Sequence, residues 1–102
     1  MSTINFEKYF DSLIGKIFKI LPLSEEVPLN DVEKYKESLL IELKGASVNF
    51  DHDSYFVAII SKIEGIRGIK DHNVCRKTVL ESLNLLKKFK TEYLKKEVKK
   101  WN

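Results

Sequence analysis

The chain has 102 residues, 43% of them hydrophobic, which is enough for the core of one small domain and excludes a chain that is disordered throughout. Its one cysteine, Cys75, excludes an internal disulfide and a metal site built on paired thiolates. No apolar run approaches the roughly 20 residues that cross a bilayer, and the N-terminal segment lacks the features of a signal peptide. We therefore expect a soluble, cytoplasmic protein in a reducing compartment.

Charge is distributed unevenly along the chain. Residues 87–102 contain seven lysines and two glutamates, whereas residues 1–86 contain eleven basic and thirteen acidic residues. The formal net charge of +3 therefore comes entirely from the C-terminal segment. The abundance of lysine, isoleucine and asparagine fits an AT-rich genome, which indicates a bacterium or a mobile element such as a phage.

The first helix is predicted over residues 4–21. Apolar residues recur every three or four positions from Phe6 to Leu21, which places them on one face of a helix. Pro22 lacks an N–H and crowds the preceding turn, so we expect the helix to end there. The segment 22–29 contains two prolines and is expected to be a connector that lies against the core.

The second helix is predicted over residues 31–48. Asn30 precedes Glu33 by three residues, which is the spacing of a capping box with asparagine as the N-cap. Apolar and small side chains then recur at helical spacing and define the inner face. These are Tyr35, Leu39, Leu40, Leu43, Ala46 and Phe50.

The third and fourth helices are predicted over residues 54–67 and 72–99. Asp53 and Asp71 are expected to be their N-caps, because a short acidic side chain can accept hydrogen bonds from the first turn. Gly68 suits the left-handed position that often follows a helix end. Each helix has its own apolar stripe, and no stretch alternates apolar and polar residues as a strand would.

Four amphipathic helices joined by short connectors favour an all-α fold, an antiparallel up-down four-helix bundle formed by residues 1–102 as a single domain. The long C-terminal helix exceeds its partners, so its last turns are expected to project beyond the bundle or to pack on another chain. Gly15 and Gly45 lie inside helices, where glycine costs about 1 kcal/mol relative to alanine. We expect them to allow the close approach of a neighbouring helix or a large ring.

Residue types that could support catalysis are present without a diagnostic arrangement. His52 and His72 lie beside aspartates at helix starts, but the spacing is not that of zinc ligands, and the two starts would lie at opposite ends of the bundle. Cys75 is next to Arg76 and Lys77, which would lower a thiol pKa, yet it falls on the apolar stripe and is expected to be a core residue. We therefore expect no enzyme activity, no cofactor and no metal.

The lysine-rich C-terminal segment carries the candidate binding residues. Its apolar side chains could dock in the groove of a protein partner; they are Phe89, Tyr93, Val98 and Trp101. Its lysines could instead neutralise phosphates without reading base sequence, since the segment lacks arginine; they are Lys87, Lys88, Lys95, Lys96, Lys99 and Lys100. A solvated helix end, whose lysines complement the helix macrodipole, is the third interpretation.

In size, basic charge and number of helices, the chain resembles the bacterial immunity proteins that act against peptide bacteriocins, many of which are small, basic, cytosolic four-helix bundles. The resemblance implies a protein that binds another protein and catalyses nothing. The sequence therefore favours a non-enzymatic protein-protein interaction module of accessory, inhibitor or immunity type, and so short a chain is also compatible with a homo-oligomer. A sequence-independent nucleic-acid-binding accessory protein is the alternative.

Overall fold

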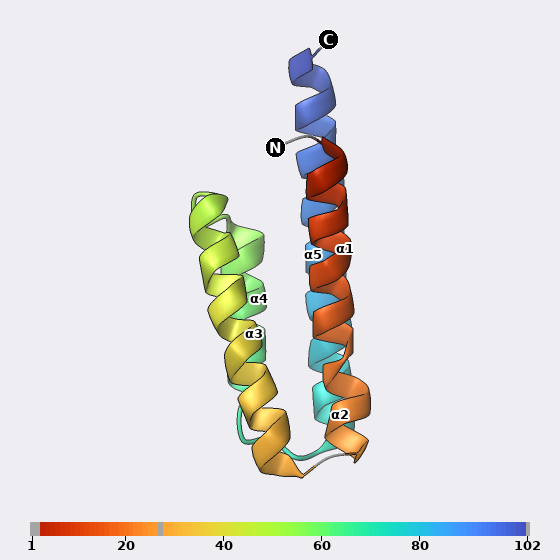
Figure 1. Ribbon diagram of the computed structural model, residues 1–102, viewed down its shortest axis with the longest axis vertical. Helices are drawn as coiled ribbons and strands as arrows, with labels where there is room; N and C mark the ends of the chain where they lie inside the picture. Colours follow the sequence, from red (N-terminus) through yellow and green to blue (C-terminus); the bar gives the residue numbers. More distant parts are fainter. Residues whose placement is uncertain (1–2, 27, 102) are drawn as a thin grey trace.

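The computed structural model describes residues 3–26 and 28–101, with side chains described for 7–23, 25, 28 and 30–95. Within these ranges the chain contains no strand and forms α1 (Thr3–Phe18), α2 (Ile20–Glu26), α3 (Leu29–Asn49), α4 (Ser54–Gly65) and α5 (His72–Trp101). The predicted all-α arrangement of four long helices is confirmed, with the short α2 in addition. Figure 1 shows successive long helices running in alternating directions along a molecule of 50 × 21 × 20 Å.

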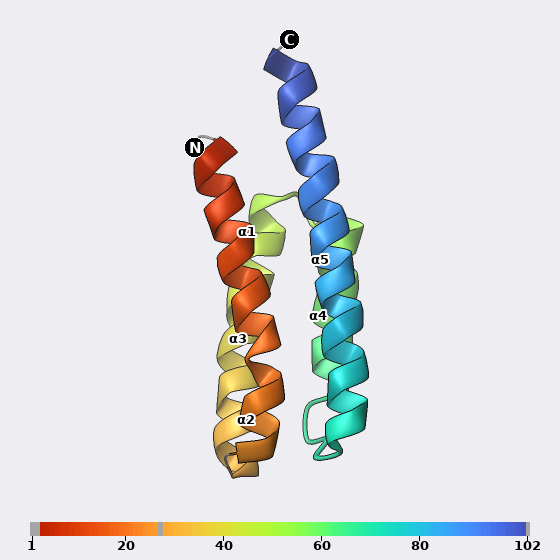
Figure 2. The same cartoon turned by 90° about the vertical axis from the view of Figure 1, so that its right-hand side faces the viewer.

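The first predicted helix is divided into α1 and α2, and the prediction that Pro22 ends it is wrong. The break lies at Lys19, and Pro22 is the third residue of α2. An N–H in the first turn of a helix has no intrahelical acceptor, so proline loses no hydrogen bond there. Most of the expected connector is consequently helical, and α2 continues α1 in nearly the same direction (Figure 2).

The start of α3 also differs from the prediction. Pro28 occupies the N-cap and makes no side-chain capping bond, so Asn30 lies inside the helix and the capping box with Glu33 is absent. The carboxylate of Glu33 is instead used by a buried lysine and by the α4–α5 loop. Glu33 thus has the spacing of a capping-box residue in the sequence, but in the structure it binds Lys36 and the N–H of Gly68.

The predicted caps of the last two helices are confirmed. Asp53 Oδ1 accepts a hydrogen bond of 2.8 Å from the N–H of Tyr55, and Asp71 Oδ1 accepts one of 2.8 Å from the N–H of Asn73. Gly68 has a φ of +76°, as expected for a left-handed residue after a helix end. The two capping bonds define where α4 and α5 begin, and the left-handed conformation of Gly68 lets the chain turn between these helices.

The core lies between two groups of helices. In Figure 1, α1, α2 and α5 form one side of the molecule and α3 and α4 form the other. α5 is central to the packing because it contacts α1, α2 and α4. Inner-face residues of the four long helices and of α2 meet in one cluster; those with no exposed surface are Phe10, Leu13, Ile17, Ile20, Leu43, Phe56, Ile59, Ile63, Cys75, Val79 and Leu86.

Gly15 and Gly45 do not serve the close packing expected of them. A Cβ atom built at either position would meet no other atom within 4 Å, and both residues are exposed. The expectation is wrong because each glycine lies on the outer side of its helix, away from the core. Neither glycine is therefore needed for the packing of helices within this chain.

Substitutions at two of the glycines are expected to have opposite effects. Gly15→Ala should raise the free energy of unfolding by about 0.5–1 kcal/mol, because the helix gains propensity and the methyl group meets open space. Gly68→Ala should lower it by about 1–2 kcal/mol, because an L side chain is strained at a φ of +76°. Urea unfolding followed by circular dichroism checks both, and effects of the same sign would contradict this interpretation.

Candidate functional site

The predicted partner-binding residues divide between the core and the end of α5. Phe89 has only 6% of its surface exposed, and its ring centroid lies 5.5 Å from that of Phe10 and 4.9 Å from that of Phe56. Tyr93 is half-buried, and its ring meets the ring of Phe50 edge-on at 5.4 Å. Phe89 is therefore a packing residue in this structure and presents almost no surface to a partner.

The end of α5 projects beyond the rest of the bundle. Figures 1 and 2 show its last turns extending past the start of α1 and past the α3–α4 connection. Val98 and Trp101 belong to this part of the helix, and their side chains lie outside the described set. A short helix without neighbours is only marginally stable in water, so contacts with another molecule would stabilise this end.

The described lysines of the predicted nucleic-acid site lie on the outer side of α5. Lys87, Lys88 and Lys95 are exposed there, whereas Lys90 on the inner side pairs with Asp11 of α1 at 2.8 Å. The three exposed lysines border an open depression of about 380 Å³. Its lining residues are Asn84, Lys87, Lys88, Thr91, Glu92 and Lys95. The side chains of Lys96, Lys99 and Lys100 lie outside the described set.

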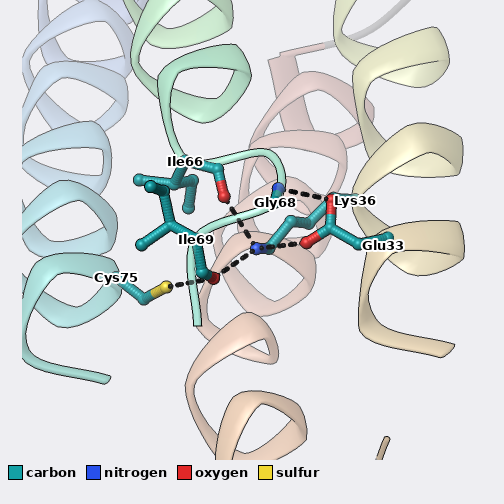
Figure 3. Close-up of polar contacts among 6 residues, drawn as sticks. All are labelled: Glu33, Lys36, Ile66, Gly68, Ile69 and Cys75. Atoms are coloured by element: carbon teal, nitrogen blue, oxygen red, sulfur yellow. Dashed lines mark hydrogen bonds and ion pairs between the residues drawn. The ribbon is translucent and has the colours of Figure 1, made fainter. Parts of the chain in front are cut away.

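A buried ion pair that the sequence prediction missed joins α3 to the α4–α5 loop (Figure 3). Lys36 is fully buried, and its Nζ lies 2.9 Å from Glu33 Oε1. The same ammonium donates to the carbonyl oxygens of Ile66 at 2.9 Å and Ile69 at 3.5 Å. Glu33 Oε2 accepts a hydrogen bond of 2.9 Å from the N–H of Gly68. The three donors of the ammonium are thus matched by three protein acceptors.

The sequence does contain a signal for this ion pair. Lys36 lies four residues after Val32 and three before Leu39, and both of these apolar residues are buried, so a lysine occupies the apolar stripe of α3. Glu33 lies one turn earlier on the same side. Because the partners of Lys36 are all groups of this chain, the arrangement stabilises the fold and is not a site for a ligand.

The ionised carboxylate of Glu33 contributes to the free energy of unfolding, because its surroundings favour the charged form. Burial acts to raise the pKa of this carboxyl, but the hydrogen bonds from Lys36 and the N–H of Gly68 outweigh burial and hold the pKa below its ordinary value of 4.5. A lowered folded-state pKa means that the stabilisation is present above the unfolded-state pKa. It is lost as the pH falls through the folded-state pKa.

Glu33→Gln is therefore expected to destabilise the protein at pH 7, and its difference from the wild type should shrink as the pH is lowered below 4.5. The difference shrinks because the wild-type carboxylate itself becomes protonated. Urea unfolding at several pH values measures this difference in the free energy of unfolding. Glu37→Gln, on the exposed side of α3, is the matched control. A difference that does not change with pH would contradict this role.

Cys75 and His72, in the first turn of α5, have different surroundings. Cys75 is buried, as predicted for a core residue, and its Sγ lies 3.7 Å from the carbonyl oxygen of Ile69. Burial raises the pKa of the Cys75 thiol, which disfavours the reactive thiolate. His72 Nε2 instead lies 3.1 Å from Glu25 Oε1 of α2.

The described residues were compared with what a metal-ligand cluster and a membrane-spanning helix require. No group of three His, Cys, Asp or Glu side chains among them is close enough to hold a metal ion. His52 lies in the α3–α4 connection and His72 begins α5, and these two places are at opposite ends of the molecule (Figure 1). Over the same part of the chain, no helix combines the length and the apolar character that crossing a bilayer requires.

Comparison with known proteins assigns no relative to this chain. No protein-family model matches the sequence, and no curated protein and no solved structure matches it. Proposals about its function therefore rest on its own residues and geometry.

Proposed function

We propose that this chain is a non-enzymatic protein-binding module of accessory, inhibitor or immunity type, encoded by a bacterium or a mobile element, and that it binds its partner with the projecting end of α5. One observation carries the proposal: α5 continues as a single helix of 30 residues past the ends of the helices that it packs against (Figure 1). The unpaired thiol of Cys75 favours action in the cytoplasm.

The partner surface is proposed to comprise Tyr93, Val98 and Trp101, without Phe89. Tyr93 retains part of its surface, and Val98 and Trp101 follow it in the same helix at spacings of five and three residues. Val98 and Trp101 lie three residues apart in the part of α5 that extends past the neighbouring helices, which is the spacing of neighbours on one helix face. An apolar helix face of this kind is typically bound in the groove of another protein.

The buried polar side chains of the bundle are used by the fold itself. Every buried side-chain nitrogen and oxygen within the described part of the chain has a hydrogen-bond partner. Such complete pairing is the normal condition of a folded interior. The surface, by contrast, presents exposed apolar side chains, among them Phe18 of α1 and Val74 of α5.

Co-purification from the source cells tests the proposal. The wild type should retain one protein in stoichiometric amount, and Val98→Ser combined with Trp101→Ser should lose it without a change in thermal stability. Val57→Ser combined with Leu80→Ser is the matched control, because it removes exposed apolar side chains from other surfaces. Retention of the protein by the α5 variant, or its equal loss from the control, would refute this surface as the partner site.

A second candidate function is sequence-independent binding of nucleic acid, which one specific observation favours. Lys87, Lys88 and Lys95 lie together along the outer side of α5, with Thr91 between them and Asn84 one turn before them as further hydrogen-bonding groups. Such a row of ammonium groups can follow a phosphate backbone. The carboxylate of Glu92 lies in the same row and would weaken the attraction.

Fluorescence anisotropy with a generic single strand and a duplex tests this second function at several salt concentrations. If three phosphates are neutralised, replacing Lys87, Lys88 and Lys95 by glutamine should weaken binding and reduce the salt slope by about 2–3. Lys34, Lys44 and Lys70 are exposed on other elements, and their replacement by glutamine is the matched control. Equal effects of the two triple variants would exclude a nucleic-acid site on α5.

A further inference from the structure

The outer side of α3 carries an apolar stripe that the bundle does not use. Ile41 and Val48 are 68% and 60% exposed, the two largest values among the large exposed apolar residues described. Gly45 lies between them at spacings of four and three residues, so the three residues share one face of the helix. On α4, Val57 is a further large apolar residue with 50% of its surface exposed.

Two charged residues of opposite sign flank this stripe. Glu37 precedes Ile41 by four residues and Lys44 follows it by three, which places them about 6 Å and about 4.5 Å along the helix axis from Ile41. Both residues are exposed. Lys44 contacts Glu64 of α4 at 2.9 Å, but an ammonium has three donors and can meet a second carboxylate.

The order of these charges selects one way of pairing two copies of α3. In an antiparallel pair centred near Ile41, Glu37 of each copy lies level with Lys44 of the other, so two opposite-charge contacts form. In a parallel pair, Glu37 would face Glu37 and Lys44 would face Lys44, which is unfavourable. Gly45, with open space around its Cα, lies one turn from the centre of this pair and would let the two helices approach closely on either side of Ile41.

We propose that the partner of this face is a second copy of the same chain, bound antiparallel along α3 about a two-fold axis near Ile41. The surface is separate from the projecting end of α5, so the proposal goes beyond the protein-binding function proposed above. α3 has 21 residues and is about 31 Å long, and one helix with its flank covers less than the roughly 800 Å² per partner of a standard interface. The dimer is accordingly expected to form at micromolar concentrations.

Sedimentation velocity over a concentration series from about 1 to about 500 µM tests the dimer. The wild type should shift from monomer to dimer, and Ile41→Ser should weaken the dimer at least about tenfold, because each dimer contains this residue twice. Glu37→Lys alone and Lys44→Glu alone should also weaken it by placing like charges opposite each other. The double variant carrying both changes should restore the wild-type dimer.

Leu80→Ser is the matched control, since it removes an exposed apolar side chain from α5 and should leave the dimer unchanged. Circular dichroism melts of all variants verify that these exposed substitutions leave the fold intact. A wild type that stays monomeric at every concentration would overturn the proposal. So would a dimer that survives Ile41→Ser, or a double charge variant that associates no better than the single ones.

Discussion

Phe89→Ala is expected to lower the free energy of unfolding by about 3–5 kcal/mol. Phe89 lies at the centre of an aromatic cluster, and its ring centroid is 4.9 Å from that of Phe56 and 5.2 Å from that of Phe50. Truncation removes these edge-to-face contacts and leaves a cavity where three segments of the chain meet. In a domain of this size, such a loss should lower the melting temperature by at least about 12 °C.

Asn84→Ala is the matched control for Phe89→Ala, because Asn84 is exposed on the outer side of the same helix. Its effect on the free energy of unfolding should stay within about 0.5 kcal/mol. Urea unfolding followed by circular dichroism measures both variants. If Phe89→Ala kept wild-type stability and lost only the binding of a partner, Phe89 would belong to the binding surface and not to the core.

Lys36→Ala is expected to lower the free energy of unfolding by a similar amount, about 3–5 kcal/mol. The substitution leaves the partly buried carboxylate of Glu33 without its cation. It also leaves the carbonyl oxygens of Ile66 and Ile69 without this donor at the end of α4, where Ile66 is the C-cap. The missing aliphatic stem adds a void beside the core.

Lys36→Met separates the two parts of this effect. Methionine fills much of the space of the lysine stem but donates no hydrogen bond, so the expected loss is smaller, about 1–3 kcal/mol. Lys34→Ala on the exposed side of α3 is the control and should change the free energy of unfolding by less than about 0.5 kcal/mol. A Lys36→Met variant as stable as the wild type would contradict a stabilising role for the ammonium.

Helical periodicity predicted which faces of the chain would be buried, because the spacing of apolar residues depends only on the geometry of one helix. Periodicity did not predict how far along α5 the neighbouring helices would extend, and hence where its apolar residues would stop being covered. Phe89 and Trp101 lie in the same lysine-rich helix, yet Phe89 meets Phe10, Phe50 and Phe56 from three other segments. The sequence could therefore identify the candidate residues of α5 but could not separate packing residues from surface residues.

Interactions between distant segments account for the other differences. The carbonyl oxygens that Lys36 meets come from residues 30 and 33 positions later in the chain, in a loop whose path depends on the packing of α4. Similarly, Pro22 is tolerated because a new helix begins at Ile20, which local propensity does not reveal. The caps of α4 and α5 were predicted correctly because Asp53 and Asp71 bond to residues within their own first turns.

A photoreactive residue in place of Trp101 tests most directly whether the projecting end of α5 touches a partner. Illumination of the source cells should produce one protein adduct from position 101 and none from a matched photoreactive residue in place of Ser61, which is exposed on α4. Mass spectrometry of the adduct identifies the partner. Absence of a protein adduct at position 101, or the same adducts from both positions, would contradict a binding role for this helix end.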